Sequence, residues 1–568
     1  MFTEEKIHKR KRNYYSEELN LYDVENLNSL FDNSLILKED SLEEIQRKMD
    51  KFTELYGIVL QGMADRYISM TRFSTVKEKK EEYSNYLKKV MSVFEKKVNE
   101  FEKSFCENIN YPGLSEEYDF YKKIIENKIS LFNEKNSKLQ SEEKSLYTEY
   151  TNFISSKVCE FNGEERTLTQ LNGYLENPDR DTREKSWKLK MRILLELEDS
   201  LNDLFDRMRP LRYKQAENLE MKSYRDYIHI LKNRFDYTPE NIYQFHDSVE
   251  KIVIPFVKKC NIDKQNELNV DELRPWDTDY DPFYYGNIFE NTDDFISKAI
   301  KGLYEIEPEY GIRLEKMKNS DLLDLESRKG KSPGGYNYPL IEYGAPFLFM
   351  NLNGTRRNIK TIFHESGHAM HTFEKAKIDL YTYRETPSEA AELAAMALEF
   401  ISTDSWHLFY SDDKSLKRAK KMQLINALKF LPWCMTVDSF QQWIYTNPDH
   451  TLRERNSYFM DLMDRFNAGI CWKGLEAEKR VNWLQQLHIF KSPFYYIEYG
   501  ISQLGALAIY KNFRENKEKA FEEYNNFLSL GNSKPLPELY KAAGIEFRFD
   551  NDYIKSIIEF VESEIEKL

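Results

Sequence analysis

The sequence predicts a large, mainly α-helical protein with one small β-sheet, and three observations lead to this. Apolar side chains recur at three- and four-residue steps over long stretches, which is the period of an amphipathic helix. Turn signals interrupt these stretches roughly every 25 to 35 residues, so packed helical hairpins are favoured over a coiled coil. Strand-like patterning is confined to two short places.

The first clear helical pattern contains apolar positions from Tyr83 to Phe105, with Lys and Glu between them. Asn110-Tyr111-Pro112-Gly113 breaks this pattern, because Pro and Gly do not continue a helix. A second helical pattern begins near Ser115 and extends past Phe132. The N-terminal part of the chain is therefore expected to be an array of helices.

The two places with strand character are short and bounded by Gly or Pro. Asn162-Gly163 lies between short mixed segments and predicts a β-hairpin. In residues 334–338 and 346–354, Gly and Pro flank short aromatic and apolar runs, and this pattern predicts a pair of strands. After Gly354 the helical patterns return and continue to the end of the chain.

The segment that follows this strand pair carries the motif His364-Glu365-Ser366-Gly367-His368. Asn358 is expected to cap a helix here, with apolar residues such as Ile362 on one side. Residues four apart lie on one face of a helix, so the two imidazoles can bind one Zn²⁺. Glu365 is rotated by about 100° from His364, which places its carboxylate beside the metal. Such a motif arises by chance roughly 0.02 times in a chain of this composition.

A catalytic zinc site needs a third protein ligand, and Glu385, Glu389 and Glu392 follow at suitable distances. Thr386-Pro387 with Glu389 predicts a capping box, which gives Glu389 a structural role. Glu385 precedes the expected helix. Glu392 lies one turn further along among Ala and Leu, where a buried carboxylate requires a cation. Glu392 is therefore the predicted third ligand.

Three neighbouring residues receive supporting roles. Glu399 lies seven residues beyond Glu392 on the same stripe and is expected to accept a hydrogen bond from a ligand imidazole. His371 lies about 10 Å along the helix axis from His364, too far for both to bind one metal ion, so it is predicted to support the site or the fold. Gly367 in mid-helix predicts the close approach of another backbone.

Composition limits the classes of function. The chain has 568 residues, a formal net charge of −14 and no long basic block, which disfavours a nucleic-acid partner. No apolar run is long enough to cross a bilayer, and no secretory signal is seen at the N-terminus. The five scattered cysteines favour free thiols in a reducing compartment, so a cytoplasmic protein is expected. A helical lobe over residues 1–195 and a catalytic region over residues 196–568 are predicted.

The motifs together resemble the M3 family of metallopeptidases, in particular its oligoendopeptidase F and Pz-peptidase branch. The resemblance runs from about Gly330 to Glu399 and reappears in the segments that contain His488–Gly500 and Gly531–Leu539. It is loose in the N-terminal half, around Phe161-Asn-Gly-Glu and Asp179-Arg-Asp-Thr-Arg-Glu.

The resemblance implies a helical, ellipsoidal fold of two lobes with a deep channel that admits short peptides and a small sheet beside the His-Glu-x-x-His helix. It implies one Zn²⁺ per chain, bound by His364, His368 and Glu392. It also implies that His488 and Tyr499 face the metal as catalytic residues. Where the family often has another Tyr, this chain has Ser492-Pro493-Phe494, so Tyr496 is predicted to act there and Tyr495 remains an alternative.

The predicted function is therefore a zinc-dependent endopeptidase that hydrolyses short peptides, with Glu365 as the general base. The strand near Phe347–Asn353 is expected to hydrogen-bond the extended substrate. The alternative is a catalytically inactive helical protein of the same fold that binds peptides. A gluzincin aminopeptidase is disfavoured because its ligand Glu would fall at Pro387, and a metzincin because its third His would fall at Glu374. The oligomeric state is not predicted.

Overall fold

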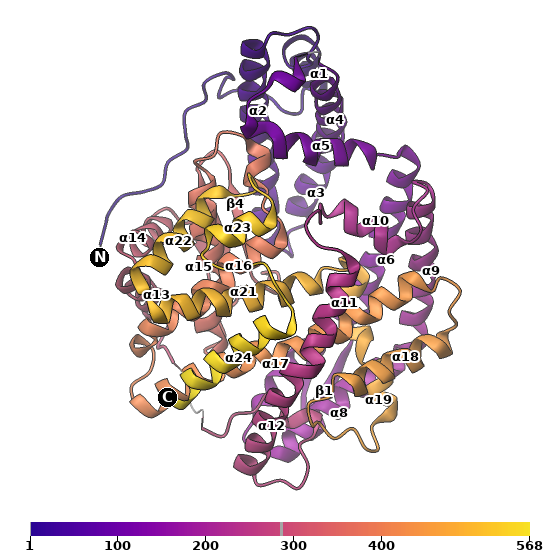
Figure 1. Cartoon of the computed structure of the whole chain (residues 1–568), viewed down its shortest axis with the longest axis vertical. Coiled ribbons are helices and arrows are strands. Elements are labelled where there is room, and N and C mark those ends of the chain that lie inside the picture. The colour runs from indigo at the N-terminus through magenta and orange to yellow at the C-terminus, as the bar shows by residue number, and fades with distance from the viewer. Residues whose placement is uncertain (1, 109, 284–287) are drawn as a thin grey trace. The chain divides into compact units, whose positions relative to one another are not determined.

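The computed structural model describes residues 2–108, 110–283 and 288–568 and is mainly helical, as predicted (Figure 1). The chain forms two compact units, each assembled from three separate segments. The first contains residues 1–130, 286–416 and 505–547, and the second contains residues 131–285, 417–504 and 548–568. The predicted boundary at residue 195 lies inside helix α8 (Arg180–Glu196) and stays a prediction.

The first unit combines an N-terminal group of helices with a small sheet and a second group of helices. Its helices are α1 (Val24–Ser34), α2 (Leu42–Arg72), α3 (Lys77–Tyr86), α4 (Ser92–Glu107), α5 (Asp119–Ser130), α13 (Thr292–Ile306), α14 (Pro308–Asn319), α15 (Arg357–Lys375), α16 (Ser388–Ile401), α22 (Lys517–Leu530) and α23 (Leu536–Ala542). Its strands are β3 (Leu323–Asp324), β4 (Tyr336–Leu340) and β5 (Ala345–Phe349).

The helix predicted from Tyr83 onward is present as the end of α3, one π-helical turn at Leu87–Met91, and α4. Its apolar stripe packs on α1 and α2 in one core cluster, in which the rings of Phe52 and Phe101 stack at 4.1 Å. The second predicted helix is shorter than expected. Helix α5 ends at Ser130, and the side chain of Asn133 caps the next helix by accepting the backbone N–H of Lys135.

The predicted strand pair is confirmed as β4 and β5, which are antiparallel. The two-residue strand β3 pairs with β5 in parallel, and the strand order is β3-β5-β4. Helix α15 packs on one face of this sheet, and α2 contacts β4. The ring of Tyr67 on α2 lies 5.2 Å from that of Tyr338, while Asn337 on the alternate face donates to the backbone carbonyl of Glu365 in α15. The sheet is thus held between two helices.

The second unit contains mainly helices and the predicted hairpin. Its helices are α6 (Glu134–Ser155), α7 (Leu168–Gly173), α8, α9 (Glu198–Glu217), α10 (Tyr224–Leu231), α11 (Pro239–Ser248), α12 (Ile254–Leu268), α17 (Asp413–Thr446), α18 (Leu452–Arg465), α19 (Glu476–Val481), α20 (Leu487–Lys491), α21 (Tyr496–Glu515) and α24 (Asn551–Glu566). The first residues of α17 and the last part of α21 belong to the first unit.

The hairpin consists of β1 (Val158–Phe161) and β2 (Glu164–Thr167). Both turn residues, Asn162 and Gly163, have positive φ angles, as a tight two-residue hairpin turn requires. All five cysteines are free, and Cys434 alone among them is fully buried. None of the helices in the described ranges is both long and apolar enough to traverse a lipid bilayer.

Candidate metal centre

Helix α15 carries the His-Glu-x-x-His motif, and it is helical over nineteen residues. Asn358 does not cap it, contrary to the prediction. The helix begins at Arg357 after Arg356 without a side-chain cap, and the Oδ1 atom of Asn358 instead accepts the backbone N–H of Asn353 at 3.1 Å. The Asn358 side chain therefore bonds the loop before the helix and does not cap the helix itself. The buried apolar stripe of Ile359, Ile362 and Phe363 determines which face of α15 packs against the core.

The two histidines project from the same face of α15. Their ring centroids lie 4.8 Å apart, with the ring planes perpendicular. About one fifth of each side chain is exposed, 22% for His364 and 21% for His368. The pair is therefore accessible at the edge of the core, which is where a metal ion that meets a substrate must be held.

Helix α16 supplies the carboxylate that the sequence predicts as the third ligand. Glu392 Oε2 lies 3.6 Å from His364 Nε2 and 3.9 Å from His368 Nε2. One potential ligand atom from each of these three residues lies within 4.8 Å of the other two. Glu385 and Glu389 are not part of this group; Glu385 Oε1 accepts a hydrogen bond from the hydroxyl of Tyr56.

The predicted capping box at the start of α16 is not formed. The helix begins at Ser388 after Pro387, without a side-chain cap. The hydroxyl of Thr386 instead accepts a hydrogen bond from the ammonium of Lys375 at 3.1 Å. The start of α16 is fixed by Pro387 and by packing, since a tertiary contact takes up the side chain expected to cap it.

Gly367 allows α15 and α16 to approach each other closely, as predicted. A Cβ atom at this position would lie 2.6 Å from the Cα atom of Ala395 and 2.8 Å from the carbonyl oxygen of Ala394. The same carbonyl accepts a hydrogen bond from the hydroxyl of Tyr524 on α22. This backbone contact sets the separation between the helix that carries the histidines and the helix that carries Glu392.

Glu399 has the supporting position that the sequence predicts for it. Its Oε1 atom lies 2.7 Å from His364 Nδ1, which leaves Nε2 of that ring turned toward Glu392. The Oε2 atom of Glu399 pairs with Lys360 at 3.2 Å. His371 is buried against the ring of Phe527, and its Nε2 atom has no hydrogen-bond partner among the described residues. It belongs to the packing of the first unit.

Glu365 lies beside the group of three and is not part of it. Its side chain is buried, and Oε2 has no hydrogen-bond partner within the described ranges. Burial raises the pKa of Glu365 to about 7; His364 acts in the opposite direction and Glu392 acts in the same direction. The carboxylate is thus held next to the imidazole pair with one oxygen available to accept a proton.

Strand β5 is the central strand of the sheet, with the two-residue strand β3 on one side and β4 on the other. The expectation that the strand near Phe347–Asn353 pairs with a peptide is therefore wrong. The N–H groups of Leu348 and Met350 are already bonded to the β3 segment. Asn337 lies opposite Leu348, and because the Leu348 N–H turns toward the β3 segment, these two residues form a non-hydrogen-bonded pair. The peptide N–H and C=O of Asn337 therefore point away from β5. Pro339 follows on this open edge and has no N–H to offer.

The predicted residues of the C-terminal motif form an aromatic cluster within the second unit. The ring centroid of His488 lies 5.7 Å from that of Tyr495, 5.1 Å from Tyr496 and 5.8 Å from Tyr499. The Tyr496 and Tyr499 rings also contact Phe430 of α17. The structure thus brings these four residues together, and both Tyr495 and Tyr496 remain adjacent to the imidazole.

A chain of hydrogen bonds fixes the imidazole of His488. The indole N–H of Trp433 donates to Gln486 Oε1 at 3.0 Å, and this orients the amide so that its Nε2 atom lies 2.8 Å from His488 Nδ1. Nδ1 is then the acceptor, and the neutral ring carries its proton on Nε2. Burial lowers the pKa of His488, and Lys491 and Lys232 add to this effect. His488 is therefore a neutral donor.

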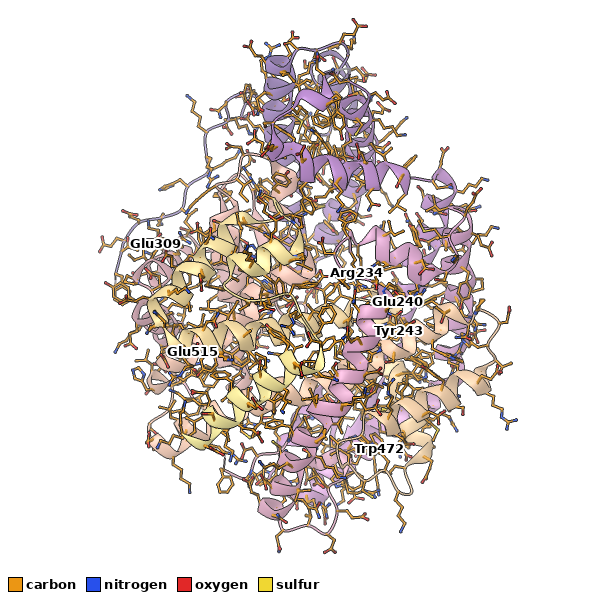
Figure 2. All side chains as sticks on the ribbon, viewed as in Figure 1. Arg234, Glu240, Tyr243, Glu309, Trp472 and Glu515 are labelled. Atoms are coloured by element: carbon orange, nitrogen blue, oxygen red, sulfur yellow. The ribbon has the colours of Figure 1, made fainter. Side chains whose placement is uncertain are left out.

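The backbone before this cluster is held in an unusual conformation. Phe494 is fully buried and has a φ angle of 61°, which non-glycine residues rarely adopt. Arg234, which is labelled in Figure 2 and lies between α10 and α11, donates to the Phe494 carbonyl at 2.6 Å and to Glu498 at 2.7 Å. The amide oxygen of Gln441 accepts the Phe494 N–H. These contacts fix the turn from which α21 begins.

Gln486, Trp433 and Asn337 have site contacts that the sequence analysis does not predict. Trp433 lies 53 residues before Gln486 in the chain, so their pairing depends on how α17 packs. The strand pattern places Asn337 in a strand but does not indicate which edge of the sheet is open. A Gln two residues before a predicted functional His was the one available signal.

Comparison with known proteins identifies relatives over most of the chain. The model of "Peptidase family M3" matches residues 173–558. An "Oligoendopeptidase F homolog" of Borreliella burgdorferi is 24% identical over 492 residues, which cover 80% of this chain and 77% of that protein. "Group B oligopeptidase PepB" of Streptococcus agalactiae is 20% identical over 483 residues, covering 81% and 77%. The solved structure "Pz peptidase A with inhibitor 2" is 26% identical with a TM-score of 0.89 and covers 98% of this chain and 99% of that one.

Proposed function

This chain belongs to peptidase family M3 and is thus a metallo-oligopeptidase, and we propose that it is an endopeptidase that hydrolyses short peptides with one Zn²⁺ per chain. His364, His368 and Glu392 would hold the ion, and Glu365 would be the general base. Membership in a peptidase family favours this function over the alternative of an inactive peptide-binding protein.

The observation that carries the proposal is the convergence of two imidazoles and one carboxylate from separate helices. Their chemistry fits Zn²⁺, which takes nitrogen and oxygen ligands at about 2.0–2.2 Å in a tetrahedral arrangement. The separations of 3.6 and 3.9 Å between Glu392 and the two imidazoles suit such a set. When bound, the ion would act as a Lewis acid on a peptide carbonyl and make water acidic near neutral pH.

Glu365 would take up the proton of the attacking water and pass it to the leaving amine. Its Oε2 atom is buried and has no hydrogen-bond partner among the described residues, so no protein group competes for that proton. Glu399 would hold His364 in the tautomer whose Nε2 lone pair is available for the ion, because Nδ1–H donates to the carboxylate.

The open edge of β4 would bind the substrate backbone. The peptide groups of Asn337 point outward from the sheet, and a peptide in extended conformation can pair with them as an added strand. A Cβ atom at Gly335 would lie 3.9 Å from Glu365 Oε1, so the start of this edge adjoins the proposed general base. Gly335 keeps that approach free of a side chain.

His488 and Tyr499 would donate hydrogen bonds to the oxygen that becomes negatively charged during attack. Their support is internal to the second unit: the Nε2–H tautomer of His488 is fixed through Gln486, and the tyrosine rings surround it. Tyr496 is proposed as a further donor. A cytoplasmic location is part of the proposal and accords with five free cysteines.

The first test is metal content and turnover. The purified protein is expected to contain about one zinc per chain and to cleave an internally quenched peptide of roughly ten residues. A chelator should abolish cleavage, and added Zn²⁺ should restore it. Cleavage that persists in the metal-free protein would contradict the proposal.

The second test separates the general base from the ligands. Glu365→Gln should retain zinc and lower kcat by about 10² to 10⁴, the usual contribution of general base catalysis. Glu374→Gln, nine residues further along α15, is the matched control and should retain turnover. Wild-type turnover by zinc-loaded Glu365→Gln would show that the assignment of the base is wrong.

A further inference from the structure

Lys375 lies at the end of α15 on the face that presents the two histidines. It is seven residues beyond His368, which corresponds to two helical turns and a rotation only about 20° off the same line. The rise of 1.5 Å per residue places it about 10 Å further along the axis. Its Nζ atom lies 3.1 Å from the hydroxyl of Thr386, just before the start of α16.

Lys375 is partly buried, and within the described residues its ammonium has one hydrogen bond, to the hydroxyl of Thr386 at 3.1 Å. Among the described residues no carboxylate lies within 4.0 Å of it. Burial lowers the pKa of Lys375 to about 8, with Glu385 acting in the opposite direction. Lys375 in turn contributes to lowering the pKa of His368 and His371, which agrees with its placement on their side of the helix.

Two structural roles do not account for this lysine. A cation near a helix C-terminus commonly bonds the last carbonyls, but the carbonyl of Ala376 accepts its hydrogen bond from Arg10. An ion pair with Glu385 is the other role, and their separation exceeds the 4.0 Å that such a pair requires. Burial of the ammonium without a paired anion is unfavourable, so the site is suited to an anion that comes from outside the chain.

The open edge of β4 leads toward this lysine. Near its start Gly335 adjoins Glu365, whereas just beyond its end the carbonyl of Glu342 accepts the N–H of Arg10. The guanidinium of Arg10 contacts Ala376 at the end of α15. Strand β4 therefore follows α15 from the general base to the helix end. An extended peptide advances about 3.3 Å per residue, so three residues span the 10 Å between His368 and Lys375.

We infer that Lys375 binds a carboxylate of the substrate about three residues from the bond that is cleaved. The inference rests on the proposed function, because it takes the metal ligands as the place of cleavage. The carboxylate has two possible sources, the free C-terminus of the peptide or an Asp or Glu side chain. The site would favour peptides that bring such a group into this register.

The test uses two series of internally quenched peptides with one fixed cleavage sequence. In one, the C-terminus lies one to five residues after the cleaved bond and is either an acid or an amide. In the other, Asp replaces Asn at each position up to five residues on either side, with the terminus amidated. For the wild-type enzyme, kcat/KM of one carboxylate peptide should exceed that of its neutral partner by about 10-fold. The series in which this occurs shows whether the carboxylate comes from the C-terminus or from an acidic side chain.

Lys375→Met should abolish this preference and leave kcat/KM for the neutral peptides within about 2-fold. Lys375→Arg should restore much of it, because it retains the charge. Lys377→Met is the matched control, since Lys377 is exposed and pairs with Glu374; it should behave as the wild type. Binding of the uncleaved acid and neutral peptides to Glu365→Gln, with and without Lys375→Met, gives a readout independent of turnover.

Equal discrimination by the wild type and by folded Lys375→Met, in cleavage and in binding, would overturn the inference. So would an absence of any preference in the wild type. In both cases the neutral peptides are still cleaved with zinc, so the proposed function stands. Failure to cleave every peptide in the presence of zinc would instead contradict the proposed function.

Discussion

The Nδ1 atom of His364 lies 2.7 Å from Oε1 of Glu399, and that carboxylate is buried. The bond joins helix α15 to helix α16 two turns away from Glu392, the predicted ligand on the same helix. It fixes the orientation of the imidazole before any metal ion binds. The arrangement is the usual one in which a carboxylate supports a metal-binding histidine.

Glu399→Gln is therefore expected to weaken zinc binding by about 10- to 100-fold, because the imidazole loses its charged acceptor. Competition with a fluorescent zinc chelator measures this affinity. Lys360→Met is the control, since Lys360 contacts the other oxygen of Glu399 and is half exposed; it should change the affinity by less than about 3-fold. Equal affinities for wild type and Glu399→Gln would contradict the supporting role.

Gly367→Ala should separate α15 from α16. The new Cβ atom would lie 2.6 Å from the Ala395 Cα atom, where the backbone cannot easily yield. We expect a loss of about 1–3 kcal/mol in the free energy of unfolding, with weaker zinc binding because the ligands lie on both helices. Gly173→Ala is the matched control, because no atom lies within 4 Å of its Cβ position in α7; it should be neutral or stabilising. An unchanged free energy of unfolding and unchanged zinc binding in Gly367→Ala would show that α15 and α16 can accept the added methyl group.

Gln486→Glu should raise the pKa of His488 by about 1–3, since a carboxylate beside Nδ1 favours the imidazolium. Titration of the His488 ring protons by NMR checks this directly. The pH profile of kcat/KM should shift with it if the neutral ring donates to the substrate. Gln485→Glu introduces the same charge one residue earlier, where the side chain faces Asn482, and should leave both measurements nearly unchanged. An unaltered His488 titration in Gln486→Glu would disprove the contact.

His450 makes the stability of the protein depend on pH. Burial lowers its pKa to about 4; the Asn447 carbonyl acts in the opposite direction and Arg209 in the same direction. In the folded protein its Nε2 atom faces the Arg209 guanidinium, which only donates, so the ring must be neutral. The unfolded chain takes up a proton near pH 6.5, so this residue costs stability as the pH falls from about 6.5 toward 4.

Between pH 7.5 and pH 5 this cost amounts to about 2 kcal/mol. Urea unfolding at both pH values should show a smaller decrease in His450→Gln than in the wild type, by up to that amount. Identical decreases in the two proteins would mean that His450 is protonated in the folded state as well.

Local regularity explains what could be predicted from the chain. The four-residue spacing of His364 and His368 places them on one face of any helix, whatever surrounds it. The crowding of Ala and Leu around Glu392 indicated a buried carboxylate before any contact was known. The Asn162-Gly163 turn and the Gly-bounded strands were predictable because positive φ angles restrict the residue type.

The two predicted helix caps are wrong because each side chain has more than one possible hydrogen-bond partner. Asn358 and Thr386 are good helix caps by residue type, but each is engaged by a group brought close by the fold, the Asn353 N–H and the Lys375 ammonium. The open edge of the sheet was assigned to the wrong strand because β3, which occupies one edge of β5, is only two residues long. A strand of that length leaves no recognisable pattern in the sequence.

The sequence by itself determined the mainly helical fold class, the helix that carries the histidines and the identity of the three proposed ligands. These depend on periodicity and burial, which are encoded within a few turns of chain. Only the tertiary structure decided that Gln486 fixes the tautomer of His488, that β4 is the open edge and that no carboxylate in the described part of the chain pairs with Lys375. Each of these depends on contacts between segments far apart in the chain, and packing, not local spacing, selects which polar groups meet.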